Sequence, residues 1–125
     1  MRDVIATKEG PQAIGPYSQA IRANGFVFVS GQVAIDPATH QFVAGDVAAQ
    51  TDRAIKNLVG ILKAAGSSLQ KVVRATVFLK NMDDFAAMNE VYGKHFSSAP
   101  PARSTVEVAR LPKDALVEID VIALA

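Results

Sequence analysis

Residues 100–121, PPARSTVEVARLPKDALVEIDV, decide how the sheet of this protein is completed and where its polar chemistry lies. The pattern predicts two strands joined by a short loop. Arg103 follows a rigid Pro-Pro-Ala lead-in, and Glu107, Glu118 and Asp120 fall within the strand-like segments. A charge in a buried or half-buried position needs a partner or a function, because burying it alone is costly.

The residue types leave two interpretations of this stretch open. Arg103 offers a planar fork suited to a carboxylate, but a salt bridge to Glu107 or to another surface acid is the simpler account of it. Glu118 and Asp120 are two residues apart in a strand and therefore share one face of the sheet. Either this face is exposed to solvent at the two positions, or the two acids have a function there.

The rest of the chain predicts an alternation of strands and helices. Asn24-Gly25 between apolar runs indicates a tight hairpin. Asp46 can cap a helix that Gly66 ends, and Asp83 or Asp84 can cap a second one. The expected apolar stripes are Val47, Thr51, Ile55, Leu58, Leu62 and Ala65 on the first helix, and Phe85, Met88, Tyr92 and Phe96 on the second. The expected strands are 4–7, 18–23, 26–31, 71–80 with Val73, Ala75, Val77 and Leu79 on one face, 104–110 and 117–124.

These elements predict one α+β domain, residues 1–125, with two helices on one face of one sheet. Two helices leave the other sheet face without a cover. Phe26 and Phe28 alternate with Val27 and Val29, so both faces of that strand are apolar. Because soluble monomers rarely expose a large apolar face, we expect the chain to associate with itself there.

Composition and charge exclude several classes of function. Thirteen Lys and Arg against twelve Asp and Glu give a formal net charge of +1, and no long basic run favours nucleic acid. The absence of Cys excludes disulfides and thiol nucleophiles. No signal peptide or membrane span is visible, so we expect a soluble, cytoplasmic protein.

Few residues outside the opening stretch suggest chemistry. His40 lies in a polar loop and His95 near a helix end, where surface roles are the simpler interpretation, and their spacing indicates no metal site. No phosphate loop or nucleophile elbow is present. Ser30-Gly31 can simply end a strand. Tyr17, in IGPYSQ, remains a further candidate.

The combination of IGPYSQ, VSGQV and PPARSTVEVARLPKDALVEIDVIA resembles the RidA (YjgF) family of imine and enamine deaminases over essentially the whole chain. The resemblance implies a single six-stranded mixed sheet, similar to that of trimeric chorismate mutase, with the last strand between 26–31 and 71–80. It implies a homotrimer with clefts between subunits. It also implies hydrolysis of 2-iminobutanoate and 2-iminopropanoate to 2-oxo acids and ammonia, without a cofactor, a metal, nucleic acid or a membrane.

The same resemblance assigns the residues of the site. It implies that Arg103 binds the substrate carboxylate and that Glu118 positions or activates water, with Asp120 ranked below it. Thr105 stands where many relatives have Cys. The substrate-binding residues that it implies are Tyr17, Ser30, Gly31, Phe85, Asn89, Arg103 and Thr105.

The topology of the family adds a prediction about the subunits. Ser30 ends its strand and Arg103 begins a parallel one, so the two should lie roughly 15–20 Å apart within a chain. We therefore expect Arg103 from one subunit to meet Ser30 and Glu118 of its neighbour. Two alternatives to the enzyme stay open: a small-carboxylate-binding regulatory module, and a ribonuclease or translation inhibitor, which the near-zero net charge disfavours.

Overall fold

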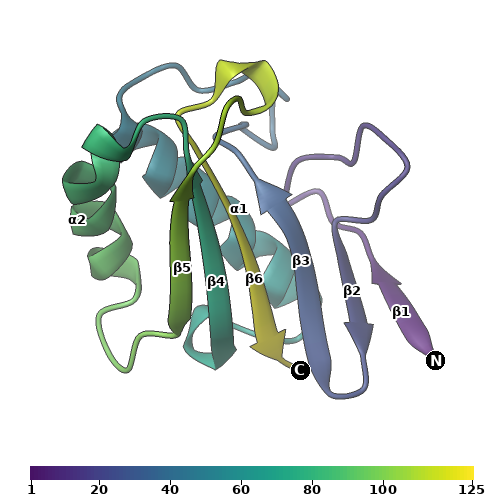
Figure 1. Ribbon diagram of the computed structural model, residues 1–125. Coiled ribbons are helices and arrows are strands. Elements are labelled where there is room, and N and C mark those ends of the chain that lie inside the picture. Colours follow the sequence, from purple (N-terminus) through teal and green to yellow (C-terminus); the bar gives the residue numbers. More distant parts are fainter.

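One six-stranded sheet forms the front layer of the protein, and two helices lie on one face of it (Figure 1). The structure is a computed structural model that describes residues 1–125. The strand order is β1-β2-β3-β6-β4-β5, and only β4 and β5 run parallel. This confirms the predicted mixed sheet, with the last strand between the third and fourth. The elements are β1 (Arg2–Ile5), β2 (Ala20–Ala23), β3 (Phe26–Gln32), α1 (Val47–Ala64), β4 (Val72–Leu79), α2 (Phe85–His95), β5 (Ala102–Glu107) and β6 (Val117–Leu124).

The local signals of the first half of the chain act as predicted. Asn24 and Gly25 have φ values of 53° and 84°, the left-handed pair of a tight β2–β3 hairpin. The Asp46 side chain accepts a hydrogen bond of 2.9 Å from the backbone N–H of Ala49 and so caps α1. The predicted stripe of α1 is buried: Val47, Thr51, Ile55, Leu58, Leu62 and Ala65.

Two expectations about the second half were wrong in detail. The buried face of β4 begins with Val72 and not with Val73, because the pairing with β6 shifts register between Val72 and Arg74. No side chain of Asp83 or Asp84 caps α2; instead Asn81 accepts a hydrogen bond of 2.9 Å from Asp83 N–H and starts a 3₁₀ turn that leads into the helix.

Two strand boundaries also differ from the prediction. β5 begins at Ala102 and ends at Glu107, three residues before the predicted end, since the chain leaves the sheet for the loop before β6. β1 covers Arg2–Ile5, where it pairs with β2, and not 4–7.

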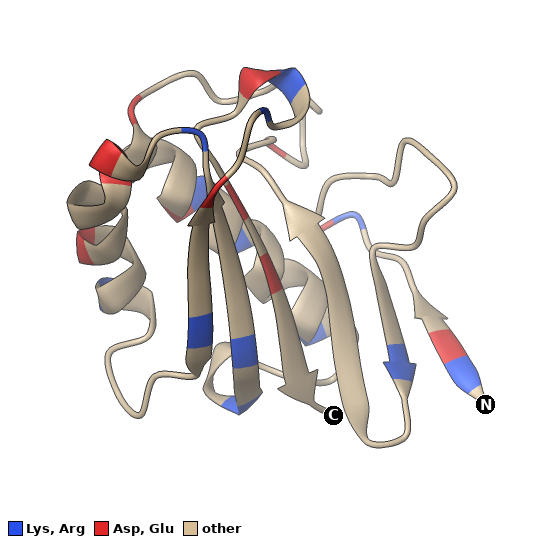
Figure 2. Ribbon diagram, in the orientation of Figure 1, with Lys and Arg blue, Asp and Glu red and all other residues tan.

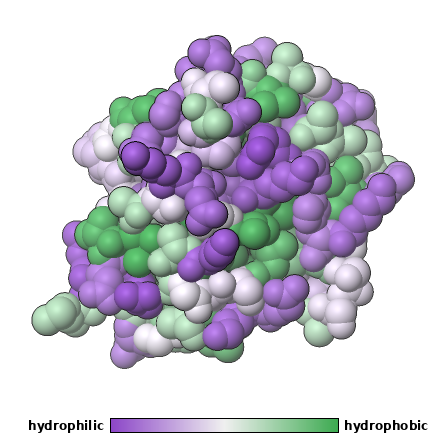
Figure 3. Space-filling model, turned by 180° about the vertical axis from the view of Figure 1, so that it is seen from behind, coloured by the Kyte–Doolittle hydropathy of each residue, from purple (hydrophilic) through white to green (hydrophobic).

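The sheet face opposite the helices stays open, as predicted. Its apolar side chains include Val4, Phe28 and Val106, which are 61%, 44% and 41% exposed. Both helices lie on the other face of the sheet, so these side chains lack a cover within the chain (Figure 1). The helix side, seen from behind, is mostly hydrophilic with separated apolar spots (Figure 3). Neither helix has the length and apolar character needed to cross a membrane.

Candidate active site

A cleft of about 630 Å³ brings together four of the predicted site residues. Tyr17, Ser30, Gly31 and Glu118 all line it. They come from the loop before β2, the end of β3 and the start of β6, which the sheet order places side by side. We call these four residues the acid half of the candidate site: Tyr17, Ser30, Gly31 and Glu118.

A bulge at the end of β3 shapes the acid half. Val29 pairs with Val121 and Gln32 pairs with Ile119, so two residues of β3 stand opposite one residue of β6. Bulges of this kind redirect side chains and are common beside active sites. The polar turn at Ser30 is therefore built by strand pairing and is more than the end of a strand.

Hydrogen bonds tie Ser30 to the segment that carries Tyr17. The Ser30 hydroxyl donates to the Ser18 carbonyl at 2.6 Å, and the Ser30 N–H donates to the Gln19 carbonyl at 2.9 Å. The buried Gln19 side chain in turn donates to the carbonyls of Gly10 and Pro11. These bonds fix the wall of the cleft from both sides.

Glu118 lies over Gly31 in a half-buried position. Burial raises the pKa of the Glu118 carboxyl above its usual value, and the charge of Asp120 raises it further. A carboxyl with a raised pKa is a stronger base than an ordinary carboxylate, which suits it to accept and return a proton. A Cβ atom on Gly31 would collide with the Glu118 carboxylate, whose Cδ atom would lie 2.8 Å away. Glycine therefore leaves the room that this carboxylate occupies.

We expect Gly31→Ala to lower kcat for the substrate proposed below by about 10- to 100-fold, because the added methyl displaces the Glu118 carboxylate, to which the proposal assigns the proton transfer. The fold should survive, since the clash is with the end of a flexible side chain. Gly93→Ala is the matched control, because a Cβ atom there meets nothing within 4 Å. Steady-state kinetics on both variants checks this, and an unchanged kcat in Gly31→Ala would contradict it.

Arg103 lies on the opposite face of the sheet from Glu118. The strand pairing puts Arg103 of β5 in one row across the sheet with three residues: Ala75 of β4, Val121 of β6 and Val29 of β3. The last three side chains are buried under the helices, and residues paired across neighbouring strands share a face. Glu118 belongs to the alternate set of β6 and faces the other way.

Two aromatic rings of α2 hold the Arg103 guanidinium. Its Cζ atom lies 4.6 Å from the centre of the Tyr92 ring and 5.7 Å from that of Phe85. No ion pair of the chain involves Arg103. The alternative of a salt bridge to Glu107 is therefore wrong: Glu107 accepts a hydrogen bond of 2.8 Å from Met82 N–H and holds the turn before α2.

The remaining predicted residues lie on β5 and α2, the elements that carry Arg103 and its two rings, and not on the strands of the acid half. Thr105 follows on the same face of β5, with its hydroxyl buried and without a partner. Asn89 lies one turn after Phe85 on α2, on the side that carries Tyr92. Arg103, Thr105, Phe85 and Asn89 form the arginine half of the site.

The separation of the two halves has a different reason from the predicted one. Arg103 stands level with Val29 across the sheet, so Ser30 and Arg103 are not offset by a strand length. They are three strand spacings apart, about 14 Å across the sheet, and the side chains of the two halves lie on opposite faces. One small ligand cannot touch both halves of the same chain.

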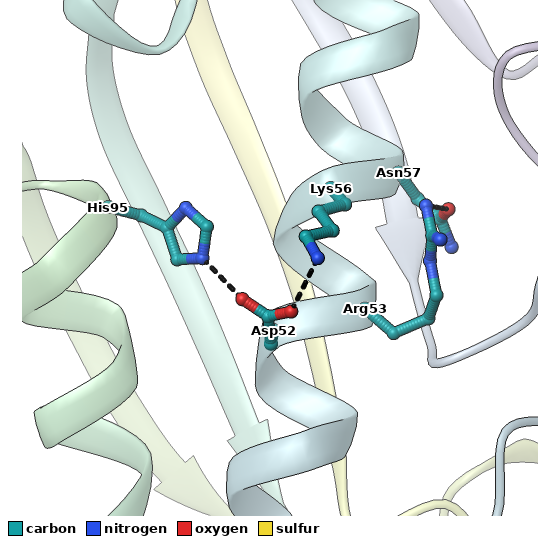
Figure 4. A network of polar contacts seen from close by, with 5 residues as sticks. All are labelled: Asp52, Arg53, Lys56, Asn57 and His95. Carbon is teal, nitrogen blue, oxygen red and sulfur yellow. Dashed lines mark hydrogen bonds and ion pairs between the residues drawn. The ribbon is translucent and has the colours of Figure 1, made fainter.

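Asp52 links the two helices behind the sheet (Figure 4). Its carboxylate lies 2.8 Å from Nε2 of His95 on α2 and 2.9 Å from Nζ of Lys56 on its own helix. These contacts, the hydrogen bond to His95 first, hold the pKa of the Asp52 carboxyl below its usual value. His95, expected to have only a surface role, thus ties α2 to α1.

Because the pKa of Asp52 is lowered in the folded protein, its contribution to stability is present above the unfolded value of 3.8 and is lost as the pH falls through the lower folded value. Asp52→Asn should therefore lower the free energy of unfolding at pH 6–7, by up to about 1 kcal/mol for such exposed partners, and this difference should shrink as the pH is lowered below 3.8. Urea unfolding across this pH range measures the difference. Glu90→Gln is the control, because Glu90 is an exposed acid of α2 that makes no ion pair.

Sequence reasoning missed several residues of the site. Gln19, Gln32, His40 and Lys113 also line the cleft, and His40 and Lys113 have φ values of 60° and 55°. Nothing in local periodicity marks such loop residues, because loops from distant parts of the chain bring them together. Tyr92 was expected only as a core residue. No cluster of three or more metal-ligating side chains is present.

Comparison with known proteins finds relatives that match almost the whole length of the chain. The family model described as Endoribonuclease L-PSP matches residues 7–125. A RutC family protein of Pyrococcus horikoshii is 54% identical, covering 98% of each chain. The 2-iminobutanoate/2-iminopropanoate deaminase of Mus musculus is 46% identical, covering 99% of this chain and 92% of that protein.

Solved structures share the fold as well. The structure of Escherichia coli TdcF with bound serine is 40% identical, covers 98% of each chain and has a TM-score of 0.94. That of a Rid family protein from Yersinia pestis is 46% identical, covers 100% of each chain and has a TM-score of 0.98. The strand order, the length of the family match and the identity to these relatives agree. The chain therefore belongs to the RidA (YjgF) family, whose model is described as endoribonuclease L-PSP.

Proposed function

We propose that this protein is an imine deaminase, which hydrolyses 2-iminobutanoate and 2-iminopropanoate to the 2-oxo acids and ammonia. The observation that carries the proposal is the Arg103 guanidinium, which rests on two rings and has no acid as a partner in its own chain. Its fork of N–H donors is free for a carboxylate from outside. The deaminase of mouse, at 46% identity, supports the reaction, and serine bound to TdcF supports an α-carboxylate ligand.

The reaction follows from orientation and proton transfer. Arg103 holds the substrate carboxylate while Glu118 takes a proton from water, whose oxygen bonds to the imine carbon. Glu118 returns that proton to the nitrogen, which gives the carbinolamine. In the second step Glu118 takes the proton of the carbinolamine hydroxyl and passes it to the nitrogen; the C–N bond breaks, ammonia leaves, and the C=O bond of the 2-oxo acid forms. An imine is already electrophilic, so holding it beside a water and an acid supplies much of the catalysis.

The active unit of this proposal is a homotrimer in which each cleft takes its two halves from neighbouring subunits. Within one chain, Arg103 and Glu118 face opposite sides of the sheet, so a second copy has to bring an arginine half to each acid half. The open sheet face, with Val4, Phe28 and Val106 exposed, gives the copies an apolar surface to share. Three copies related by a rotation close such a heterologous contact into a ring.

A coupled assay tests the function. Threonine dehydratase generates 2-aminocrotonate, which tautomerises to 2-iminobutanoate, and semicarbazide traps the imine that is not hydrolysed. Addition of this protein should lower the yield of the semicarbazone and speed the appearance of 2-oxobutanoate. No effect at protein concentrations equal to those of the dehydratase would contradict the proposal.

A carboxylate-binding regulatory module is the competing function, since bound serine in TdcF is equally consistent with binding alone. The half-buried Glu118 favours the enzyme, because an acid beside a bound carboxylate weakens binding and helps only in proton transfer. The ribonuclease in the name of the family finds less support. The Lys and Arg residues are dispersed among acids over the fold and form no basic stripe (Figure 2).

A further inference from the structure

We propose that Tyr92 is the positioning residue of the arginine half: its ring holds the Arg103 guanidinium by its face and leaves the N–H donors free for the substrate carboxylate. The inference rests on the proposed carboxylate-binding role of Arg103 and deepens it. It starts from the 4.6 Å between the Arg103 Cζ atom and the centre of the Tyr92 ring.

The kind of contact matters for what Arg103 can bind. A carboxylate partner would occupy the in-plane N–H donors of the guanidinium and compete with a substrate for them. An aromatic ring attracts the cation through its face and uses none of those donors. Arg103 has two such rings and no acid in its own chain, so it is held in place and yet remains available.

Tyr92 is itself fixed from several sides. It is 5% exposed, and its ring lies 4.5 Å from that of Phe96, at an angle of 30°. The contact between His95 and Asp52 ties the same turn of α2 to α1. Phe85, in contrast, is 40% exposed and lies further from the guanidinium. Tyr92 therefore provides the rigid support and Phe85 an outer flank.

The hydroxyl of Tyr92 is buried and has no hydrogen-bond partner. Burial raises the pKa of this phenol, while the charge of Arg103 and its closeness to the hydroxyl oppose the rise. The geometry between the hydroxyl and the guanidinium is not that of a hydrogen bond, and an unpaired buried hydroxyl is costly. The proposal therefore assigns the support of Arg103 to the ring and gives no role to the hydroxyl.

The test compares four variants for their binding of 2-oxobutanoate by calorimetry and for their kinetics on 2-iminobutanoate. Tyr92→Leu removes the ring and should raise Kd and KM by about 5- to 30-fold. Its kcat should stay within about threefold of the wild-type value, because a carboxylate clamp binds the substrate and the transition state equally. Tyr92→Phe keeps the ring and should stay within about twofold of the wild type in both constants. Phe85→Leu, at a partly exposed position that should fold normally, should raise KM by about two- to threefold.

Met88→Ala is the matched control, since it opens a cavity in the buried face of α2 but removes no ring from Arg103. It should lower the melting temperature as much as Tyr92→Leu does and leave KM unchanged. Equal KM values for Tyr92→Leu, Met88→Ala and the wild type would overturn the proposal, as would a Tyr92→Phe variant as impaired as Tyr92→Leu.

The readouts separate this inference from the proposed function. If the wild type binds 2-oxobutanoate but hydrolyses no imine, the proposed reaction fails, and the Kd values still decide the role of Tyr92. If the wild type shows neither binding nor turnover, both proposals are contradicted.

Discussion

Arg103→Ala should reduce kcat/KM for 2-iminobutanoate by about 10²- to 10³-fold, since a bidentate charge-assisted pair with the substrate carboxylate is lost. The variant should fold and assemble like the wild type, because Arg103 makes no ion pair within its chain and its guanidinium lies over the rings of Phe85 and Tyr92. Steady-state kinetics, circular dichroism and size-exclusion chromatography measure the three properties together.

Arg22→Ala is the matched control for Arg103→Ala. Arg22 lies on β2, far across the sheet, where it pairs with Asp3 at 3.4 Å and donates to the Ala65 carbonyl at 2.7 Å. Its loss should affect stability and leave kinetics unchanged. Full activity of Arg103→Ala on 2-iminobutanoate would refute the clamp.

Glu118→Gln should have the second large effect, a loss of about 10²- to 10⁴-fold that falls mainly on kcat, because the amide keeps the shape but cannot carry a proton. The control is Asp120→Asn, which keeps Glu118 and removes the charge that helps to raise its pKa. That variant should retain most of its turnover and shift the acidic limb of its pH–rate profile to lower pH. An unchanged kcat in Glu118→Gln would remove Glu118 from the chemistry.

Glu118→Gln should also stabilise the fold at neutral pH. A carboxyl whose pKa is raised by burial gives up stability as the pH rises from its unfolded value, 4.5, through the higher folded value. Glutamine carries no charge and avoids that cost, which for a half-exposed group is under about 1 kcal/mol. The expected combination of lower turnover and higher melting temperature is typical of a residue kept for function.

The elements were predictable from sequence where local chemistry determines them. Asn24-Gly25 requires the left-handed turn that it adopts, Asp46 caps α1, and the 3.6-residue period marked the buried face of that helix. The last strand was placed between β3 and β4 only through the resemblance to a family. Pairing order depends on contacts between distant segments, which periodicity does not encode.

The candidate site was only partly predictable. The resemblance assigned roles to Arg103 and Glu118, but neither the pattern nor the motif states that the two lie on opposite faces of the sheet. That relation depends on the register of β5 against β4, where Arg103 stands beside Ala75. Tyr92 was missed because a ring that packs in the core and a ring that supports a cation give the same helical stripe.

Mixed assembly of two inactive variants tests the composite cleft most directly. Refolding equal amounts of Arg103→Ala and Glu118→Gln chains together forms trimers in which some clefts take Arg103 from one chain and Glu118 from the other. Random assembly makes about a quarter of the clefts complete, because each of the two subunits at a cleft has an even chance of supplying its intact half.

The activity of the mixture should therefore recover to about a quarter of that of the wild type, while each variant refolded alone stays inactive. Differently tagged chains that purify together establish that mixing has occurred. Verified mixed trimers with no more activity than the separate variants would contradict a site shared between subunits.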